Sequence, residues 1–402
     1  MLKKIKGGIT APKGFKASGV KAGLKKSGKL DLAIIYSTVL ASIAAVFTNN
    51  TMAAAPVILS RQAVKNGTAS AIIVNSGCAN ACTGPQGLID AQAMVHMTAQ
   101  LLELEDQEVI VASTGIIGVN LQMDKIAVGI KEAVAKLDER GSESATTAIM
   151  TTDTFSKSCA YEFELGGVPV RIAGIAKGSG MIHPNMATML CFITTDAAIA
   201  PSILKQALTE AVNVSFNMIS VDGDSSTNDM TSVLANGLAG NALIESSDCK
   251  DYTILAAALT EVCKYLAQQV VRDGEGATKF LEITVQGAEN EADAKKAVMA
   301  IAKSPLVKTA FFGEDANWGR ILCAVGYSEA AVDPEKISLA IGDVTIVKAG
   351  MGANYDEKAL KDIMAQQDIT VTVDLSLGAG TATMWTCDFS YEYVKINGEY
   401  HT

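Results

Sequence analysis

The chain has 402 residues, of which 49% are hydrophobic, 19% are charged and only 5% are aromatic. This apolar fraction is sufficient for a buried core and excludes a chain that is disordered throughout. A formal net charge of −10 disfavours nucleic acid as the main partner. The longest apolar stretch, Leu32–Phe47, has 16 residues with four polar interruptions, which is short of the ~20 apolar residues that span a bilayer. We therefore expect no membrane partner.

The first 30 residues are strongly basic. Nine lysines precede Asp31, the first acidic residue, and glycines recur between them. Glycine lowers helix propensity, so this segment does not fit the amphipathic helix of a targeting peptide. We expect a loop-like start and a cytoplasmic protein.

Cysteine and histidine are distributed in a way that argues against a metal site. The eight cysteines are scattered without a C-x-x-C pair, and only three histidines exist. Cys191 and Cys323 lie inside apolar runs, which predicts buried free thiols in a reducing compartment. No metal ion is expected.

Strand-like and helix-like patterns alternate along the chain. The predicted strands are Leu32–Ile35, Ala71–Val74, Val109–Ala112, Val168–Ala173, Met189–Thr194, Leu281–Val285, Leu306–Phe311, Val344–Val347 and Ile369–Asp374. The predicted helices are Ile89–Leu104, Met123–Leu137, Ser202–Met218, Asp251–Arg272, Glu291–Ala302 and Glu357–Gln366. This mixture predicts an α/β protein, or α+β layers, with a lobe boundary near Thr278.

One segment carries a chemical signal. A strand ending at Lys177 runs into the glycine loop Gly178-Ser179-Gly180, and a new apolar strand starts at Thr188. One interpretation is a long hairpin connection in which Thr188 is an ordinary strand residue. The other is a self-cleaving Ala187–Thr188 bond, which would leave Thr188 with a nucleophilic hydroxyl and a basic α-amine in one residue. Spacing alone leaves both open.

The segment from Lys177 to Leu190 resembles the self-processing junction of the ornithine acetyltransferase family, the glutamate N-acetyltransferases of arginine biosynthesis. Further strings match that family in order along nearly the whole chain. They are Gly8-Ile-Thr-Ala-Pro-Lys-Gly-Phe15, Val74-Asn-Ser-Gly77, Ser113-Thr-Gly-Ile-Ile-Gly118, Thr151-Thr-Asp-Thr154, Val221-Asp-Gly-Asp224, Arg272-Asp-Gly-Glu-Gly-Ala-Thr278, Asn317-Trp-Gly-Arg320 and Tyr393-Val-Lys-Ile-Asn397.

The resemblance implies an N-terminal-nucleophile-like fold, an αββα sandwich like that of the related aminopeptidases, with a smaller C-terminal α/β lobe. It implies cleavage into an α chain, 1–187, and a β chain, 188–402, in which 188–279 completes the sandwich and 280–402 forms the lobe. Thr188 would be the nucleophile, and Thr114 and Gly115 the oxyanion hole. The substrate contacts that it implies are Thr151, Lys177, Thr188, Glu275, Asn397 and Thr402.

The same resemblance implies transfer of acetyl from N2-acetylornithine to glutamate, with release of ornithine. No cofactor is expected, and acetyl-CoA is a further candidate donor. The α and β chains are expected to stay paired in an α2β2 heterotetramer. Two alternatives remain open: an aminopeptidase or amidase of the same fold, and a non-catalytic amino-acid-binding protein. Cys78, Ser156 and His401 depart from the family pattern, and His401 leaves affinity at the chain end uncertain because imidazole and guanidinium differ in charge.

Overall fold

The computed structural model describes residues 2–183 and 189–399. The chain forms two compact units. Of the described residues, one unit contains those up to Asn217 and Asp224–Val270, and the other contains Met218–Gly223 and residues 271–399. Each unit is built on its own mixed β-sheet, which confirms the predicted α/β class.

The first unit holds a nine-stranded sheet in the order β1-β6-β7-β8-β10-β3-β4-β5, with β2 paired to β3. The β4–β5 and β8–β10 pairs are parallel, and the remaining pairs are antiparallel. The strands are β1 (Lys3–Lys4), β2 (Phe15–Val20), β3 (Leu32–Phe47), β4 (Thr68–Cys78), β5 (Val109–Ile116), β6 (Lys157–Leu165), β7 (Val168–Lys177), β8 (Leu190–Thr195) and β10 (Met230–Ala235).

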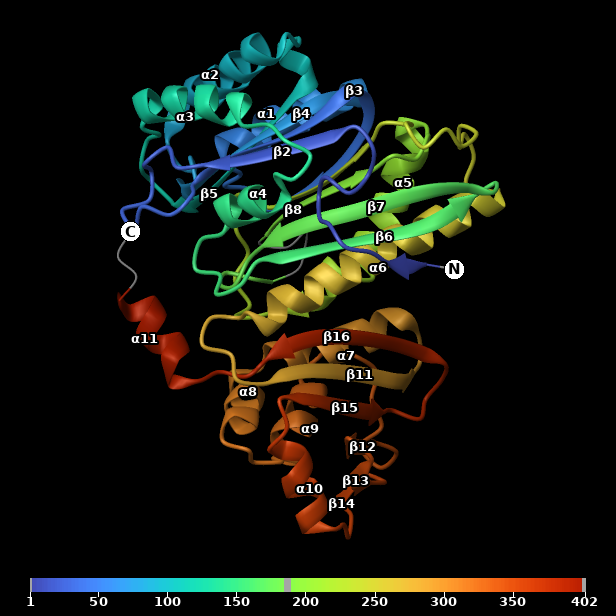
Figure 1. The fold of residues 1–402 in the computed structure, drawn as a ribbon. Coiled ribbons are helices and arrows are strands. Elements are labelled where there is room, and N and C mark those ends of the chain that lie inside the picture. Colours follow the sequence, from blue (N-terminus) through green and yellow to red (C-terminus); the bar gives the residue numbers. More distant parts are fainter. Residues whose placement is uncertain (1, 184–188, 400–402) are drawn as a thin grey trace. The chain divides into compact units, whose positions relative to one another are not determined.

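Helices cover this sheet, as Figure 1 shows. The α-helices of the unit are α1 (Ala55–Ala63), α2 (Gly84–Leu102), α3 (Met123–Ala135), α4 (Ser142–Ile149), α5 (Pro201–Asn213) and α6 (Lys250–Arg272), the last of which ends in the second unit. Short 3-10 turns are η1 (Val64–Asn66), η2 (Asp106–Glu108) and η3 (Phe216–Met218).

The alternation of side chains along β4 shows how the layers form. Ala71 and Ile73 pack in a cluster with Met94 of α2 and Ile130 of α3. Ile72, on the other face of the strand, packs in a second cluster that includes residues of β7 and β8, because successive side chains point to opposite faces. The half of the sheet that contains β4 and the half that contains β7 and β8 therefore share one core between them. Helices α2 and α3 pack on the outer face of the first half.

Helix α6 packs against the half of the sheet that contains β7. A Cβ at Gly174 of β7 would lie 2.8 Å from Leu266 and 2.9 Å from Val262, so the missing side chain allows the helix to approach the strand closely. Its length and apolar composition would also suit a membrane span, but half of its apolar window is buried in the fold, as in a core helix. The layers in this unit are thus helices, one half of the sheet, its other half, and helices again.

The second unit has a seven-stranded sheet in the order β14-β13-β12-β15-β11-β16-β9. Residues 218–223 belong here because β9 pairs with β16. The strands are β9 (Ile219–Ser220), β11 (Phe280–Ala288), β12 (Ser338–Ile341), β13 (Val344–Lys348), β14 (Met351–Gly352), β15 (Asp368–Asp374) and β16 (Gly380–Cys387). The helices are α7 (Glu291–Lys303), α8 (Pro305–Phe312), α9 (Trp318–Gly326), α10 (Glu357–Met364) and α11 (Tyr391–Glu399).

Three expectations were wrong. Leu306–Phe311, predicted as a strand, lies in helix α8, whose first turn is capped by Ser304 accepting a hydrogen bond from the Val307 N–H. The basic start is not loop-like throughout, since it contains β2. Cys323 is exposed, because the apolar run around it forms the short helix α9 with one face toward solvent.

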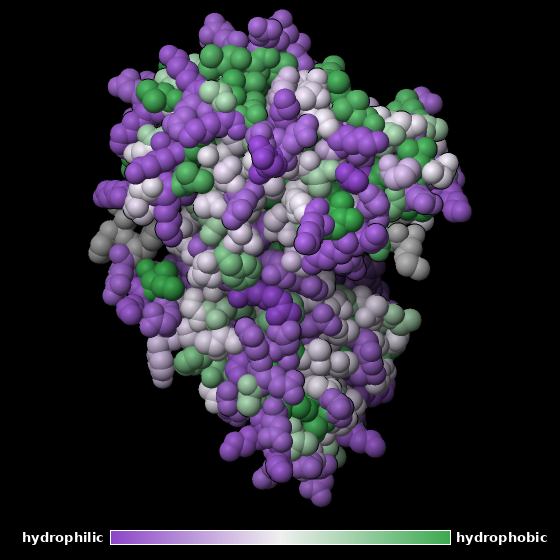
Figure 2. All heavy atoms as spheres, in the orientation of Figure 1, coloured by the Kyte–Doolittle hydropathy of each residue, from purple (hydrophilic) through white to green (hydrophobic). Residues whose placement is uncertain are grey.

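Hydrophilic residues cover much of the face drawn in Figure 2.

Candidate active site

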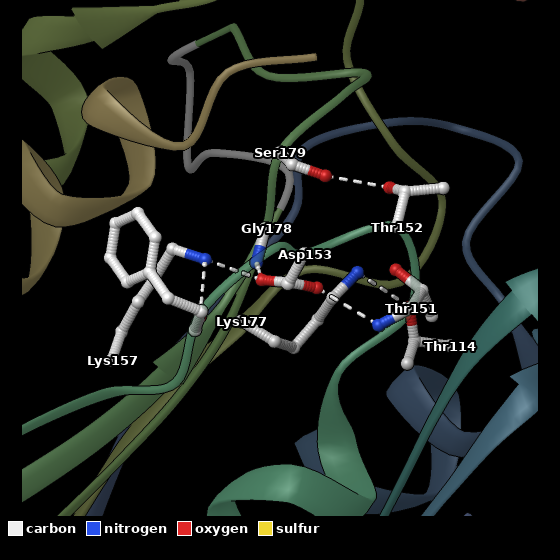
Figure 3. A network of polar contacts seen from close by, with 9 residues as sticks. Thr114, Thr151, Thr152, Asp153, Lys157, Lys177, Gly178 and Ser179 are labelled. Atoms are coloured by element: carbon white, nitrogen blue, oxygen red, sulfur yellow. Dashed lines mark hydrogen bonds and ion pairs between the residues drawn. The ribbon is translucent and has the colours of Figure 1, made fainter. Parts of the chain in front are cut away.

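The ends of β5 and β7 and the start of β8 meet in the first unit. Lys177, the last residue of β7, pairs with Leu190, the first residue of β8. Its ammonium Nζ lies 3.2 Å from Oγ1 of Thr114 in β5, and both side chains are largely buried (Figure 3). The end of β7 and the start of β8 therefore lie close to Thr114, the predicted oxyanion-hole residue.

Asp153 organises the polar side of this cluster. Its carboxylate accepts hydrogen bonds from the Gly178 N–H at 2.7 Å, the Thr151 N–H at 2.9 Å and the Lys157 ammonium at 2.6 Å (Figure 3). Burial alone would raise the pKa of Asp153, but the positive charges of Lys177 and Lys157 and the Gly178 hydrogen bond lower it to about 2. The carboxylate stays ionised and fixes both loops.

The loop at Thr151 is joined to the glycine loop by a second contact. The hydroxyls of Thr152 and Ser179 lie 2.6 Å apart. Lys157, whose side chain is fully buried, holds its ammonium 5.0 Å from the ring centroid of Phe155. These contacts keep the Thr151 segment beside the end of β7.

Gly115 must be glycine for a packing reason. Its φ is +132°, which side-chain-bearing residues rarely adopt. A Cβ there would lie 2.4 Å from the carbonyl carbon of Gly77 in the neighbouring strand β4. The close approach of β4 and β5 thus fixes the backbone beside Thr114.

Neighbouring polar side chains brace the end of β5. The Asn228 amide donates to the carbonyl oxygens of Ala79 at 2.6 Å and Ser113 at 2.8 Å. The Ser113 hydroxyl in turn donates to Asn75. The segment before β10 is therefore fastened to the residue that precedes Thr114.

Lys25 contributes a further positive charge near the cluster. Its ammonium donates to the Leu30 carbonyl at 2.7 Å. Burial, opposed by Asp31 and reinforced by the charge of Lys177, lowers the pKa of Lys25 to about 8. Part of the basic amino-terminal segment is thus in electrostatic contact with this cluster.

In the second unit, two of the predicted substrate contacts meet each other. The Asn397 amide donates to Glu275 at 2.9 Å. The loop that carries Glu275 is held against the start of α11, since the Ser390 hydroxyl donates to the Gly276 carbonyl. Gly276 has φ +70° and could not carry a side chain without meeting Tyr393.

The sequence predictions thus fall into two groups. Thr114, Gly115, Thr151 and Lys177 are brought together in the first unit, and Glu275 and Asn397 in the second. The remaining predicted residues, Ala187, Thr188 and Thr402, lie outside the described residues.

Sequence reasoning gave no role to two buried carboxyl groups that interact with Lys177, those of Asp153 and Asp229. Asp153 lies in the motif Thr151-Thr-Asp-Thr154, which matches the family, but the sequence did not predict a role for it. Asp229 ends the polar run 226–229 directly before the apolar strand β10. An aspartate directly before a buried strand is the sequence feature that could have predicted a buried carboxyl group here, because Asp is almost never fully buried unless it has a partner.

A mixed sheet with helices outside both of its halves and a buried lysine–threonine contact where its strands end defines a layered α/β protein. The model of the ArgJ family matches residues 16–402. The arginine biosynthesis bifunctional protein ArgJ of Symbiobacterium thermophilum is 50% identical over 400 residues, covering 99% of each chain. The protein of the same name from Geobacter sulfurreducens is 51% identical over 391 residues, covering 97% of this chain and 99% of the other. This chain belongs to the ArgJ family.

A solved structure agrees with this assignment. The crystal structure of the arginine biosynthesis bifunctional protein ArgJ from Bacillus halodurans is 44% identical, with a TM-score of 0.52. The match covers 53% of this chain and 100% of the other.

Proposed function

We propose that this chain is a glutamate N-acetyltransferase of arginine biosynthesis that carries the acetyl group on Thr188. Membership of the ArgJ family supports the activity, since its relatives are named as bifunctional proteins of arginine biosynthesis. The observation that carries the proposal is the Lys177–Thr114 contact of 3.2 Å at the point where β7 pairs with β8. It joins the two strands flanking the predicted junction to the predicted oxyanion residue.

The nucleophile would be made by self-cleavage. The Thr188 hydroxyl oxygen attacks the Ala187 carbonyl carbon, the C–N bond of that peptide breaks, and the new amine takes up the proton. Water then hydrolyses the ester, which leaves an Ala187 carboxylate and a free hydroxyl. A fragment 188–402 would make up 53% of the 402 residues, the same share that the fully covered Bacillus halodurans chain matches.

Acetyl transfer would use the same hydroxyl twice. Thr188 attacks the acetyl carbon of N2-acetylornithine, the amide C–N bond breaks, and ornithine leaves with the proton. The α-amine of glutamate then attacks the acetyl ester and regenerates the hydroxyl. Both steps pass through an oxyanion, which we assign to Thr114 and Gly115 because hydrogen-bond donors placed where that charge develops give the largest rate effects.

Substrate contacts follow from charge. Lys177 supplies a cation for a carboxylate and Glu275 an anion for an amine. Thr151, held to Asp153, and Asn397, held to Glu275, would complete these contacts together with Thr402. No cofactor is needed for this chemistry, and acetyl-CoA is a candidate second donor.

The assembly belongs to the same proposal. The α chain 1–187 and the β chain 188–402 would remain paired, as an α2β2 heterotetramer in the cytoplasm. Within the β chain, residues 188–279 would complete the catalytic sandwich and 280–402 would form the lobe.

Cleavage is tested by denaturing mass spectrometry of the purified protein. We expect two fragments that meet at Ala187–Thr188, an uncut chain for Thr188→Ala, and cleavage again for Thr188→Ser, which keeps a hydroxyl. Cut Thr188→Ala protein would contradict the proposed nucleophile.

The reaction is tested with N2-acetylornithine with and without glutamate. We expect N-acetylglutamate to form and the acetyl mass to appear on the fragment that starts at Thr188. Acetate released at the same rate without glutamate would indicate the hydrolase. Acetyl-CoA in place of acetylornithine shows whether this chain uses both donors.

A further inference from the structure

Asn228 holds the end of β5 through its side-chain amide. The amide nitrogen donates to the Ser113 carbonyl at 2.8 Å and to the Ala79 carbonyl at 2.6 Å. The residue is only 6% exposed, and its side-chain oxygen accepts the Thr227 hydroxyl at 2.6 Å. Because this last contact occupies the acceptor end of the amide, both donor hydrogens are directed at the two carbonyls.

These two bonds reach both sides of the predicted oxyanion pair, Thr114 and Gly115. Ser113 directly precedes Thr114, and its carbonyl shares one planar peptide group with the Thr114 N–H. On the other side, the Ala79 N–H donates to the carbonyl of Ile116, the residue after Gly115, at 2.9 Å. The same side chain therefore holds the pair from both ends, once directly and once by way of Ala79.

The contact lies on the outer edge of β5, the last strand in the order of the sheet. On this edge the Ser60 hydroxyl donates to the Val111 carbonyl at 2.7 Å and accepts the Val111 N–H at 3.0 Å. Two residues on, Asn228 occupies the Ser113 carbonyl. Backbone groups two residues apart in a strand point to the same edge. We therefore expect the next N–H in this row, that of Gly115, to point to the outer edge as well, where it can donate to an oxyanion.

An oxyanion hole needs donors that are in place before the charge develops, because reorienting them during the reaction removes much of their effect. Glycine is the most flexible residue of a backbone, so the direction of the Gly115 N–H has to be fixed by its neighbours. The two bonds from Asn228 provide such a constraint on either side of it.

We propose that Asn228 is a positioning residue for the oxyanion hole, which sets the directions of the Gly115 N–H and the Thr114 hydroxyl by holding the chain on both sides of them. This inference rests on the proposed function, because these two residues meet an oxyanion only if the chain transfers an acyl group. In the cut protein the same bonds would join the two fragments, since Asn228 follows the proposed cleavage site and Ser113 and Ala79 precede it.

The test is Asn228→Leu in the full chain. Leucine has the same branched shape and the same number of side-chain heavy atoms, but it cannot donate to either carbonyl. We expect kcat of the acetylornithine–glutamate reaction, counted per cut chain, to fall by about 100-fold, with KM for acetylornithine within about twofold, as for a small misplacement of groups around the reacting atoms.

A matched control is Asn241→Leu. Asn241 is another buried asparagine of the first unit, and its amide also donates to two carbonyls, those of Ala198 at 3.2 Å and Ala242 at 2.8 Å. Neither carbonyl adjoins the oxyanion residues in the sequence. We expect both variants to lower the midpoint of thermal unfolding, but only Asn228→Leu to lower kcat.

Hydrogen exchange gives a second measurement that needs neither cleavage nor activity. Peptides that cover residues 113–116 should take up deuterium faster in Asn228→Leu than in the wild type, and at the wild-type rate in Asn241→Leu. If Asn228→Leu is not cut, this measurement decides. Should Asn228→Leu fail to fold, Asn228→Asp, which keeps the shape and replaces the donor nitrogen with an oxygen, takes its place.

Three outcomes would overturn the inference. The first is a cut Asn228→Leu enzyme with wild-type kcat. The second is unchanged deuterium uptake at residues 113–116, since the strand would then be held without Asn228. The third is an equal loss of kcat in Asn241→Leu, which would show a general effect of losing a buried amide. Failure of the wild type itself to transfer acetyl would instead remove the proposed function, so the two failures are distinguishable.

Discussion

At the scale of single residues, Thr114 depends on its contact with Lys177. The ammonium donates to the Thr114 hydroxyl oxygen at 3.2 Å, which leaves the hydroxyl hydrogen free to point elsewhere. A threonine with its oxygen engaged in this way can donate to a developing oxyanion. The hydroxyl, and not the methyl group, should therefore matter for the rate.

We expect Thr114→Val to lower kcat by about 100-fold or more, the usual cost of one oxyanion donor, with KM little changed. Thr114→Ser keeps the hydroxyl and should retain most of the activity. Steady-state kinetics of the acetylornithine–glutamate reaction provide the measurement. Equal losses in the two variants would show that the site needs the shape of threonine and not its donor.

The resemblance, not spacing, singled out Thr114 and Lys177, and their contact required the fold. The role of a carboxyl is harder to read from sequence. Asp153 and Asp229 are both buried, yet the pKa is lowered in the first and raised in the second. The difference comes from the lysines and N–H groups around each one, and these neighbours come from distant parts of the chain.

At the scale of elements, Asp153 joins the loop between α4 and β6 to the end of β7 through Thr151, Lys157 and Gly178. Its pKa is about 2 in the folded chain against 3.8 for the ordinary group. A pKa lowered by folding stabilises the protein above pH 4, and this contribution disappears as the pH falls toward 2. At 1.36 kcal/mol per pKa unit, the contribution is about 2–3 kcal/mol.

We expect Asp153→Asn to destabilise the first unit by about 3–5 kcal/mol at pH 7, because the buried Lys157 ammonium loses its carboxylate partner. The difference from the wild type should shrink between pH 4 and pH 2. Urea unfolding at several pH values, followed by far-UV circular dichroism, measures it.

The double variant Asp153→Asn/Lys157→Met removes both charges and should recover much of the loss. A stability difference that is the same at pH 7 and pH 2 would contradict this account of the Asp153 carboxylate.

Secondary structure was predictable where periodicity was strong. The predicted Val109–Ala112 and Val168–Ala173 lie inside β5 and β7, and Asp251–Arg272 nearly coincides with α6. The run after Pro305 was misread because its apolar residues also suit a strand. Ser304 and Pro305 decide the matter locally by capping and starting a helix. A strand such as β10, only six residues long with Thr and Ser inside it, is defined by its neighbours more than by its own pattern.

At the scale of the molecule, the two units offer separate optical signals. Both tryptophans of the chain, Trp318 and Trp385, belong to the second unit. The Trp385 indole N–H donates to Glu282 at 2.8 Å, which ties it to the sheet. Tryptophan fluorescence thus reports on the second unit, while circular dichroism reports on both.

A matched pair of core variants tests whether the units unfold independently. Ile283→Ala in β11 and Ile110→Ala in β5 each truncate a fully buried isoleucine and should cost about 2–5 kcal/mol. We expect Ile283→Ala to shift the fluorescence midpoint in urea, and Ile110→Ala to shift only part of the dichroism transition. A single coincident transition that moves equally in both variants would show one cooperative unit.

The order of strands in the nine-stranded sheet bears on when the proposed cleavage could occur. β8 and β10 lie between β7 and β3, so strands encoded after residue 188 fill a gap between strands encoded before it. A polypeptide ending at residue 187 would lack β8 and β10, so the edges of β7 and β3 would have no strand to pair with. Unpaired strand edges of this kind promote aggregation. Assembly must therefore precede the proposed cleavage, and the two resulting fragments, interleaved by main-chain hydrogen bonds, would not exchange between molecules without unfolding.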